Sequence, residues 1–184
     1  MTYTPARTQR WFPSRTWYRE AAVIGAGAAF LCILAQVAVP LQPVPITGQT
    51  LGVLLVGGYL GFRRGVSAVA LYVALGGIGL PVFAHGTGGI AVLVGPTAGY
   101  LIGFLVAAGI VGLIAEHGLL RTYPMALLTL SAATAAVFAF GLAWLAAYVP
   151  TDVLFAAGFW PFLPGALIKI GIAMVLVRQD RARR

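Results

Sequence analysis

The stretch Trp160-Pro-Phe-Leu-Pro-Gly-Ala-Leu-Ile-Lys-Ile-Gly-Ile-Ala-Met-Val-Leu-Val177 decides the fold that we expect for this chain. It is an apolar run with a single lysine, Lys169, near its middle, and a helix needs about 20 such residues to cross a membrane. An ionisable side chain at membrane depth is costly and by default marks a functional site with a partner. We therefore predict a transmembrane helix over 161–177, and the partner of Lys169 becomes the main question about function.

The composition of the whole chain is that of an integral membrane protein. Of its 184 residues, 60% are hydrophobic and only 9% are charged, whereas a soluble domain carries about 25% charged residues. The net charge of +8 would suggest nucleic acid in a soluble protein, but here orientation in the bilayer explains it better. One cysteine, Cys32, excludes a disulfide framework or a cysteine metal site. Two histidines do not make a metal site, so we expect no metal.

Six apolar segments predict an all-α membrane protein with six transmembrane helices in one compact bundle. We divide the chain into a basic and aromatic interfacial segment over 1–20, the membrane domain over 21–177 and a basic tail over 178–184. The apolar run after residue 20 has no convincing signal-peptide cleavage site, so we expect the first span to be retained. The expected spans are 21–39, 49–62, 66–80, 96–115, 124–148 and 161–177.

Basic residues alternate along the chain and predict its orientation. They occur before the first span and after the second, fourth and sixth spans. The other three connections, 40–48, 81–95 and 149–160, contain no arginine or lysine. The positive-inside rule then places both termini in the cytoplasm and the neutral connections outside. We expect the protein in the cell (inner) membrane of a bacterial or archaeal-type cell.

The sequence offers Lys169 no acidic partner inside the membrane. Glu20 and Glu116 lie at expected cytoplasmic ends, Asp152 lies in an outer connection and Asp180 lies in the tail. A lysine that snorkels and bonds to backbone carbonyls is one interpretation. The other is an anionic or strongly accepting ligand that enters from outside. Three spans begin on that side, and their positive dipole ends favour this second interpretation.

The segment 76–89 is rich in glycine but too apolar for a flexible linker. Irregular backbone at membrane depth survives only where protein or a cavity covers it, so we expect an ordered re-entrant loop. Phe83 and His85 could line such a cavity, although a hydrogen-bonded loop residue is the simpler interpretation of His85. In the first span, Ala22 and Ala26 belong to a face of small residues that allows close helix approach. That face could serve internal packing or an external partner.

Four blocks of sequence, in order, resemble the signatures of the BioY biotin transporters, which are the substrate-binding S-components of energy-coupling factor (ECF) transporters. The resemblance implies six membrane helices and high-affinity capture of biotin from the outer face. It implies no cofactor, since biotin is the transported ligand. It also implies a partner module of a transmembrane T-component, which Ala22 and Ala26 would contact, and two cytoplasmic ATPases. The blocks are Pro43-Val-Pro-Ile-Thr-Gly-Gln-Thr50, Gly76-Gly-Ile-Gly-Leu-Pro-Val-Phe83, Gly95-Pro-Thr-Ala-Gly-Tyr100 and Pro161-Phe-Leu-Pro-Gly-Ala-Leu-Ile-Lys169.

The resemblance also implies a set of ligand-binding residues. We expect Lys169 to bond either the carboxylate or the ureido ring of biotin, and Phe83 and Trp160 to cover its apolar parts. Many family members carry an aspartate three residues before this lysine, where this chain has Ala166, so the role of that aspartate cannot be carried over. The hydrogen-bonding candidates at the outer helix starts are Thr47, Gln49, Thr97 and Tyr100.

Two other classes of function stay open at this point. A small intramembrane enzyme would use Lys169 or His85 as a base, and a structural or assembly subunit would bind anionic lipid through its basic ends. The sequence has no Gly-x-x-x-x-Gly-Lys-Ser/Thr nucleotide motif and no Ser-His-Asp arrangement. We therefore expect a transport subunit rather than an enzyme, and the energy for uphill transport must come from a partner.

Overall fold

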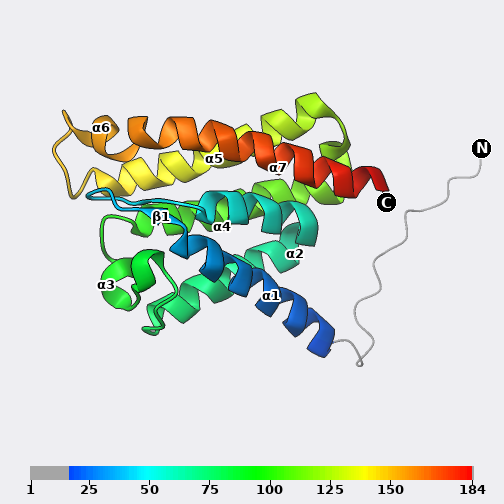
Figure 1. Ribbon diagram of the computed structural model, residues 1–184, viewed down its shortest axis with the longest axis horizontal. Coiled ribbons are helices and arrows are strands. Elements are labelled where there is room, and N and C mark those ends of the chain that lie inside the picture. Colours follow the sequence, from blue (N-terminus) through cyan, green and yellow to red (C-terminus); the bar gives the residue numbers. More distant parts are fainter. Residues whose placement is uncertain (1–16, 184) are drawn as a thin grey trace, which may run out of the picture.

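The computed structural model describes residues 17–183, with side chains up to residue 178, as a bundle of long helices (Figure 1). Five helices of the described chain are long and apolar enough to cross a membrane. Of the expected interfacial segment over 1–20, residues 1–16 lie outside the described part of the chain, and residues 17–20 belong to α1. The long helices are α1 (Trp17–Gln36), α2 (Gln49–Gly77), α4 (Ala98–Glu116), α5 (Tyr123–Leu145) and α7 (Leu163–Arg183).

The helix α2 contains two antiparallel arms, because the chain reverses direction at Gly61. Gly61 has φ 81° and ψ −174°, a backbone conformation that is essentially restricted to glycine. The arms lie side by side: a Cβ atom on Gly65 would lie 3.1 Å from the Cα of Gly57, and the Gln49 side chain donates a hydrogen bond to the Tyr72 hydroxyl. The arms correspond to the second and third predicted spans. The prediction of an all-α membrane bundle with six helices is thus confirmed as a bundle of about six. The separate loop expected after residue 62 is replaced by a turn at one residue.

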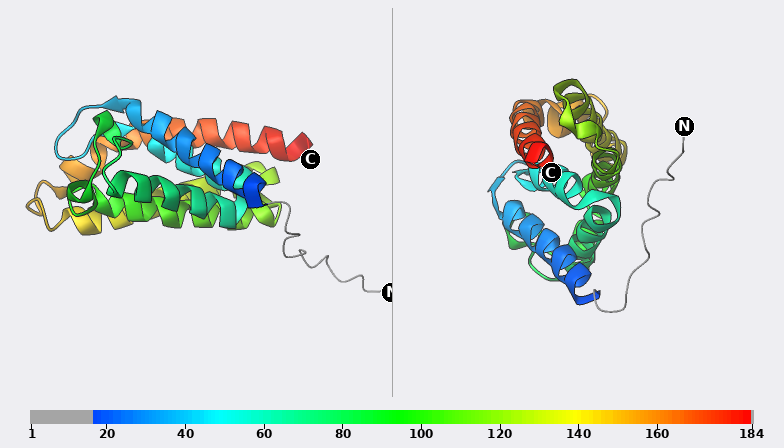
Figure 2. Two further views of the ribbon diagram at one scale, coloured as in Figure 1. Left: turned by 90° about the horizontal axis from the view of Figure 1, so that it is seen from below. Right: turned by 90° about the vertical axis from the view of Figure 1, so that its right-hand side faces the viewer.

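The core of the bundle lies where α2 packs against α4 and α4 against α5, while α1 lies at one edge (Figure 2). Glycine permits the close approach of these helices, as in other membrane bundles. A Cβ atom on Gly112 would lie 2.6 Å from the backbone of Gly61, and one on Gly103 would lie 2.8 Å from the Cα of Val137. In the spanning segment of α4, 67% of the residues are buried, whereas in that of α1 only 22% are buried. The helix α1 is therefore peripheral.

One end of the bundle is held together by charged side chains. The Glu20 carboxylate at the start of α1 pairs with Arg64 just after the turn of α2. The Glu116 carboxylate at the end of α4 accepts a 2.9 Å bond from the backbone N–H of Phe62. Near the end of α7, Arg178 donates a 3.0 Å bond to the carbonyl of Arg121. The start of α1 and the end of α7 lie at this same end (Figure 1).

The opposite end of the bundle carries short elements that connect the long helices. The antiparallel strands β1 (Ala38–Val39) and β2 (Ile46–Thr47) follow α1. The segment 78–97, between α2 and α4, is an ordered loop that contains the 3-10 helix η1 (Ala84–Gly86) and α3 (Ile90–Leu93). Between α5 and α7 lie α6 (Leu154–Gly158) and the 3-10 helix η3 (Trp160–Phe162). Together these segments enclose one end of the helix bundle.

Candidate ligand-binding cavity

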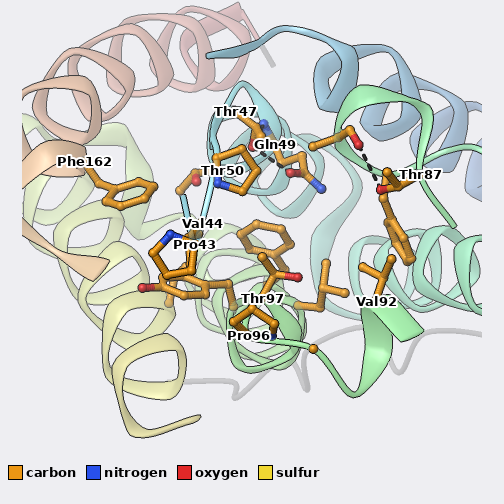
Figure 3. A pocket seen from close by; sticks show the side chains of 18 of the residues that line it. Pro43, Val44, Thr47, Gln49, Thr50, Thr87, Val92, Pro96, Thr97 and Phe162 are labelled. Atoms are coloured by element: carbon orange, nitrogen blue, oxygen red, sulfur yellow. Dashed lines mark hydrogen bonds between the residues drawn. The ribbon is translucent and has the colours of Figure 1, made fainter. Parts of the chain in front are cut away.

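A cavity of about 380 Å³ lies among these short elements and the adjoining helix ends. Its volume falls within the about 300–1,000 Å³ of typical small-molecule sites. The wall is mostly apolar and comes from four parts of the chain, within 43–50, 83–104, 134–138 and 162–169. Figure 3 shows Thr47, Gln49, Thr97 and Phe162 around one common space, although they come from different elements.

Lys169 is the cationic group of the described cavity wall. It lies six residues after the start of α7 at Leu163, or about 9 Å along the helix axis. The side chain is half-buried, and its Nζ donates a 2.6 Å hydrogen bond to the backbone carbonyl of Thr47 in β2. Of the described side chains, no carboxylate pairs with it. Its charge is thus met by one carbonyl dipole.

Next to this bond, Thr47 and Gln49 form a short chain of polar side chains. The Thr47 hydroxyl donates to the Gln49 side-chain carbonyl over 2.6 Å and accepts a 3.3 Å bond from the Gln49 backbone N–H. The amide group of Gln49 donates in turn to the hydroxyl of the fully buried Tyr72. Because Gln49 is buried and both ends of its side-chain amide are hydrogen-bonded, it is held in one orientation at the cavity wall.

Phe83 closes another side of the cavity. Its ring meets the ring of Tyr72 edge to face, with centroids 5.4 Å apart, an arrangement that aromatic pairs favour. It lies directly on Gly76, where an added Cβ atom would come within 2.0 Å of the ring. His85, two residues later, also lines the cavity; it is exposed and has φ 57°, in the left-handed region. The loop thus presents one buried aromatic and one exposed polar ring.

Tyr100 and Phe162 form the facing wall. The Tyr100 hydroxyl donates a 2.8 Å bond to the carbonyl of Gly158, and its ring stacks on Phe162 with centroids 6.3 Å apart. The ring of Tyr100 also lies against Gly141 of α5, where a Cβ atom would be 2.3 Å from it. Thr97, the residue before α4, completes this side of the wall. Aromatic surface therefore faces the cavity from opposite sides.

The structure brings six of the seven predicted ligand residues to this cavity. They are Lys169, Thr47, Gln49, Phe83, Thr97 and Tyr100. Trp160 is 60% exposed and is not part of the cavity wall. Ala22 and Ala26 lie on the exposed side of α1, whereas the neighbouring Gly27 and Ala28 face the interior. The binding and partner-contact roles of these residues stay predictions.

Sequence reasoning missed several residues of the wall. Phe162 lines the cavity in place of Trp160, and the 3-10 turn η3 decides which of the two aromatics faces inward. Thr134 and Phe138 reach the wall from α5. In the sequence, Thr134 stood out only as a polar residue within an apolar span. In the structure, its hydroxyl donates a 2.8 Å hydrogen bond to the Leu130 carbonyl. Such a bond is common for threonine in a membrane helix.

These groups define what the cavity can bind. It offers one ammonium group, several neutral hydroxyl and amide groups, and aromatic and aliphatic surface. In the described part of the chain, no three His, Cys, Asp or Glu side chains gather as metal ligands would. The arrangement suits a small, partly apolar molecule with an anionic or strongly accepting group.

Comparison with known proteins points to one family. The sequence profile of the BioY family matches residues 6–184. The chain is 44% identical over 176 residues to the biotin transporter BioY of Rhodobacter capsulatus, covering 87% of this chain and 92% of that protein. It is 39% identical over 160 residues to the biotin transporter BioY of Thermotoga maritima, covering 86% and 93% respectively.

The fold is likewise similar to that of a solved structure. The crystal structure of the S-component for biotin from an ECF-type ABC transporter has a TM-score of 0.81 and 28% sequence identity with this chain. The likeness covers 94% of this chain and 95% of that one. It therefore extends over nearly the whole of both chains.

Proposed function

The chain belongs to the BioY family, and we propose that it binds biotin in the cavity beside Lys169 as the S-component of an ECF-type importer. It is an integral membrane protein of a transporter family, so the alternative of an intramembrane enzyme is set aside. The family supplies the identity of the ligand, and the geometry of the cavity supports the place at which the ligand binds.

The observation that carries this proposal is the state of Lys169. A partly buried charge is costly unless it is paired and hydrogen-bonded, yet its Nζ meets the Thr47 carbonyl and no described carboxylate. Ala166, which occupies the position where the resemblance leads us to expect an aspartate, lines the same wall with a methyl group. A ligand that accepts hydrogen bonds strongly would supply the missing partner.

The rest of the cavity suits the remainder of biotin. Phe83, Phe162 and Tyr100 present aromatic surface that would cover the bicyclic ring system and the valeryl chain. Thr47, Gln49 and Thr97 carry hydrogen-bonding groups at the same wall (Figure 3). Biotin would thereby be held by many apolar contacts and oriented by a few polar ones, as is usual for small-ligand sites.

Equilibrium binding of radiolabelled biotin to the purified protein tests this proposal. Hydrogen bonds to a charged group contribute about 1.5–3 kcal/mol, so Lys169→Met should weaken binding by about 10- to 100-fold. Arg19→Gln also removes one positive charge, but at the exposed start of α1, and should leave affinity unchanged. No binding by the natural protein below micromolar concentration, or equal affinity of the Lys169→Met variant, would contradict the proposal.

A second ligand identifies the group that meets Lys169. Biotin amide lacks the carboxylate charge but keeps the ureido ring. If the carboxylate meets Lys169, biotin amide should bind the natural protein more weakly than biotin does. The Lys169→Met variant should then bind the two ligands almost equally, because loss of the lysine and loss of the carboxylate remove the same interaction. If the ureido ring meets Lys169, the losses add. The four affinities together assign the orientation of the ligand.

The same family relationship supports a dependence on partner subunits. We expect a T-component and two cytoplasmic ATPases to energise release into the cell, with Ala22 and Ala26 on the exposed side of α1 at the contact. The alternation of basic loops supports an orientation in which the cavity end faces outside and the basic end faces the cytoplasm. Biotin would then be captured from the outer face before the partners act.

A further inference from the structure

Gln36, the last residue of α1, binds the backbone of the cavity loop with both ends of its side-chain amide. Its Nε2 donates to the carbonyl of Phe83 over 3.1 Å and lies 3.4 Å from that of Val82. Its Oε1 accepts a 3.0 Å bond from the N–H of Gly86. Only one orientation of the amide satisfies these partners, because the first two are acceptors and the third is a donor. One side chain thus spans the turn 82–86.

The segment that Gln36 holds forms part of the cavity wall. Phe83, Ala84 and His85 all line the cavity, and Gly86 presents its N–H to Gln36 from a left-handed turn with φ 66°. Phe83 contacts Tyr72, whose hydroxyl accepts the bond from Gln49. The Gln36 amide is therefore one of the contacts that place this part of the wall relative to Gln49, beside the packing of Phe83 on Tyr72.

The helix that carries Gln36 lies at the periphery of the bundle. Its packing is mainly against α2, and beyond α2 it touches η1 and β2. The residue after Gln36, Val37, accepts a 2.8 Å bond from the N–H of Gly48, next to Thr47, whose carbonyl binds Lys169. The end of α1 is thus joined to two sides of the cavity, through Gln36 to the loop and through Val37 to the strand β2.

We propose that Gln36 is a positioning residue that fixes the 82–86 wall over the bound ligand and so slows ligand dissociation. It does not line the cavity itself, so it acts through Phe83 and His85. A displacement of the exposed helix α1 would withdraw the Gln36 amide and loosen the wall. The identity of the ligand as biotin rests on the proposed function; the link between Gln36 and the loop does not.

Dissociation of radiolabelled biotin from the purified protein provides the first test. Gln36→Ala removes the side-chain donor to Phe83 and the side-chain acceptor of Gly86, whose N–H keeps its 3.1 Å bond to the Phe83 carbonyl. It should raise the dissociation rate constant by up to about tenfold, the loss of about one net hydrogen bond, while the number of binding sites is retained. Gln36→Glu keeps an acceptor for Gly86 but sets a carboxylate oxygen against the carbonyls of Phe83 and Val82, which repel it, so an increase at least as large is expected. Ile33→Ala, at a 66% exposed position of the same helix, should leave the rate constant unchanged.

Hydrogen–deuterium exchange of the ligand-free protein provides the second test. Amides of 82–87 should exchange faster in Gln36→Ala than in the natural protein or in Ile33→Ala, while those of α4 and α5 exchange as before. If the natural protein fails to bind biotin, the proposed function is wrong, yet this measurement still decides the role of Gln36.

Two results would overturn the proposal. One is an unchanged dissociation rate constant together with unchanged exchange over 82–87 in Gln36→Ala. The other is a loss of binding sites in both Gln36 variants without faster dissociation from the sites that remain. The second result would assign Gln36 to folding of the protein rather than to retention of the ligand.

Discussion

At the scale of single residues, the methyl group of Ala166 lies in the cavity wall one helical turn before Lys169. Many BioY proteins, by the resemblance, carry an aspartate at this point, and with alanine here the ammonium rests on the Thr47 carbonyl. A carbonyl dipole satisfies a hydrogen bond but does not neutralise a charge. In this chain the ligand itself must therefore balance more of the Lys169 charge than in a protein with an aspartate beside the lysine.

Small residues also determine how tightly the aromatic wall is packed. Gly141→Ala would place a Cβ atom 2.3 Å from the ring of Tyr100, and overpacking of this kind costs about 1–3 kcal/mol. We expect the apparent melting temperature in detergent to fall by about 2–10 °C, and biotin to bind more weakly because Tyr100 and Phe162 must shift.

The control for this variant is Gly171→Ala in α7. A Cβ atom at Gly171 would meet no atom within 4 Å, so this variant should be as stable as the natural protein or slightly more stable, since alanine favours helix more than glycine. Equal melting temperatures for Gly141→Ala and Gly171→Ala would show that the wall has room that the structure does not indicate.

At the scale of elements, hydrophobicity predicted the membrane crossings but not the way the chain turns between them. Bounds of the long spans agree to within a few residues, except that α7 continues to Arg183, because apolar length reports directly on burial in a bilayer. The reversal at Gly61 depends on one backbone conformation. The strands β1 and β2 span two residues each and are stabilised by tertiary contacts, so local sequence carried no signal for them.

The helix α1 offers a prediction of its own, since its exposed side is the expected site of the T-component. Ala26 is exposed on α1, beside an apolar groove shared with α2. Ala26→Trp would prevent close helix approach there. We expect uptake of labelled biotin by cells that produce the variant with its partners to fall at least tenfold, while biotin binding by the purified variant stays unchanged.

Ala135→Trp on α5 is the matched control, because Ala135 is also an exposed alanine within a membrane helix. It should leave both uptake and binding unchanged. Normal uptake by the Ala26→Trp variant would remove this side of α1 from the partner interface. A parallel loss of binding would instead show that the groove supports the cavity.

At the scale of the whole molecule, the two ends of the bundle have different chemistry. The cavity occupies the end with the short connecting elements, and arginines 64, 121 and 178 take part in contacts at the other end. The predicted ligand residues met because alternate spans begin at one end, which the order of spans in the sequence already implies. Phe162 and Thr134 could not be predicted, because their direction depends on how η3 and α5 pack.

This division of the molecule predicts its orientation in the membrane. Positively charged connections are retained in the cytoplasm, so the cavity end should face outside. In a Cys32→Ser background, a cysteine at the exposed Asp152, in the connection between α5 and α6, should react with a membrane-impermeant maleimide in intact cells. A cysteine at the exposed His117, after α4, should react only after the cells are permeabilised. The reverse pattern would turn the cavity towards the cytoplasm, and capture of biotin from outside would then require a site other than that of Lys169.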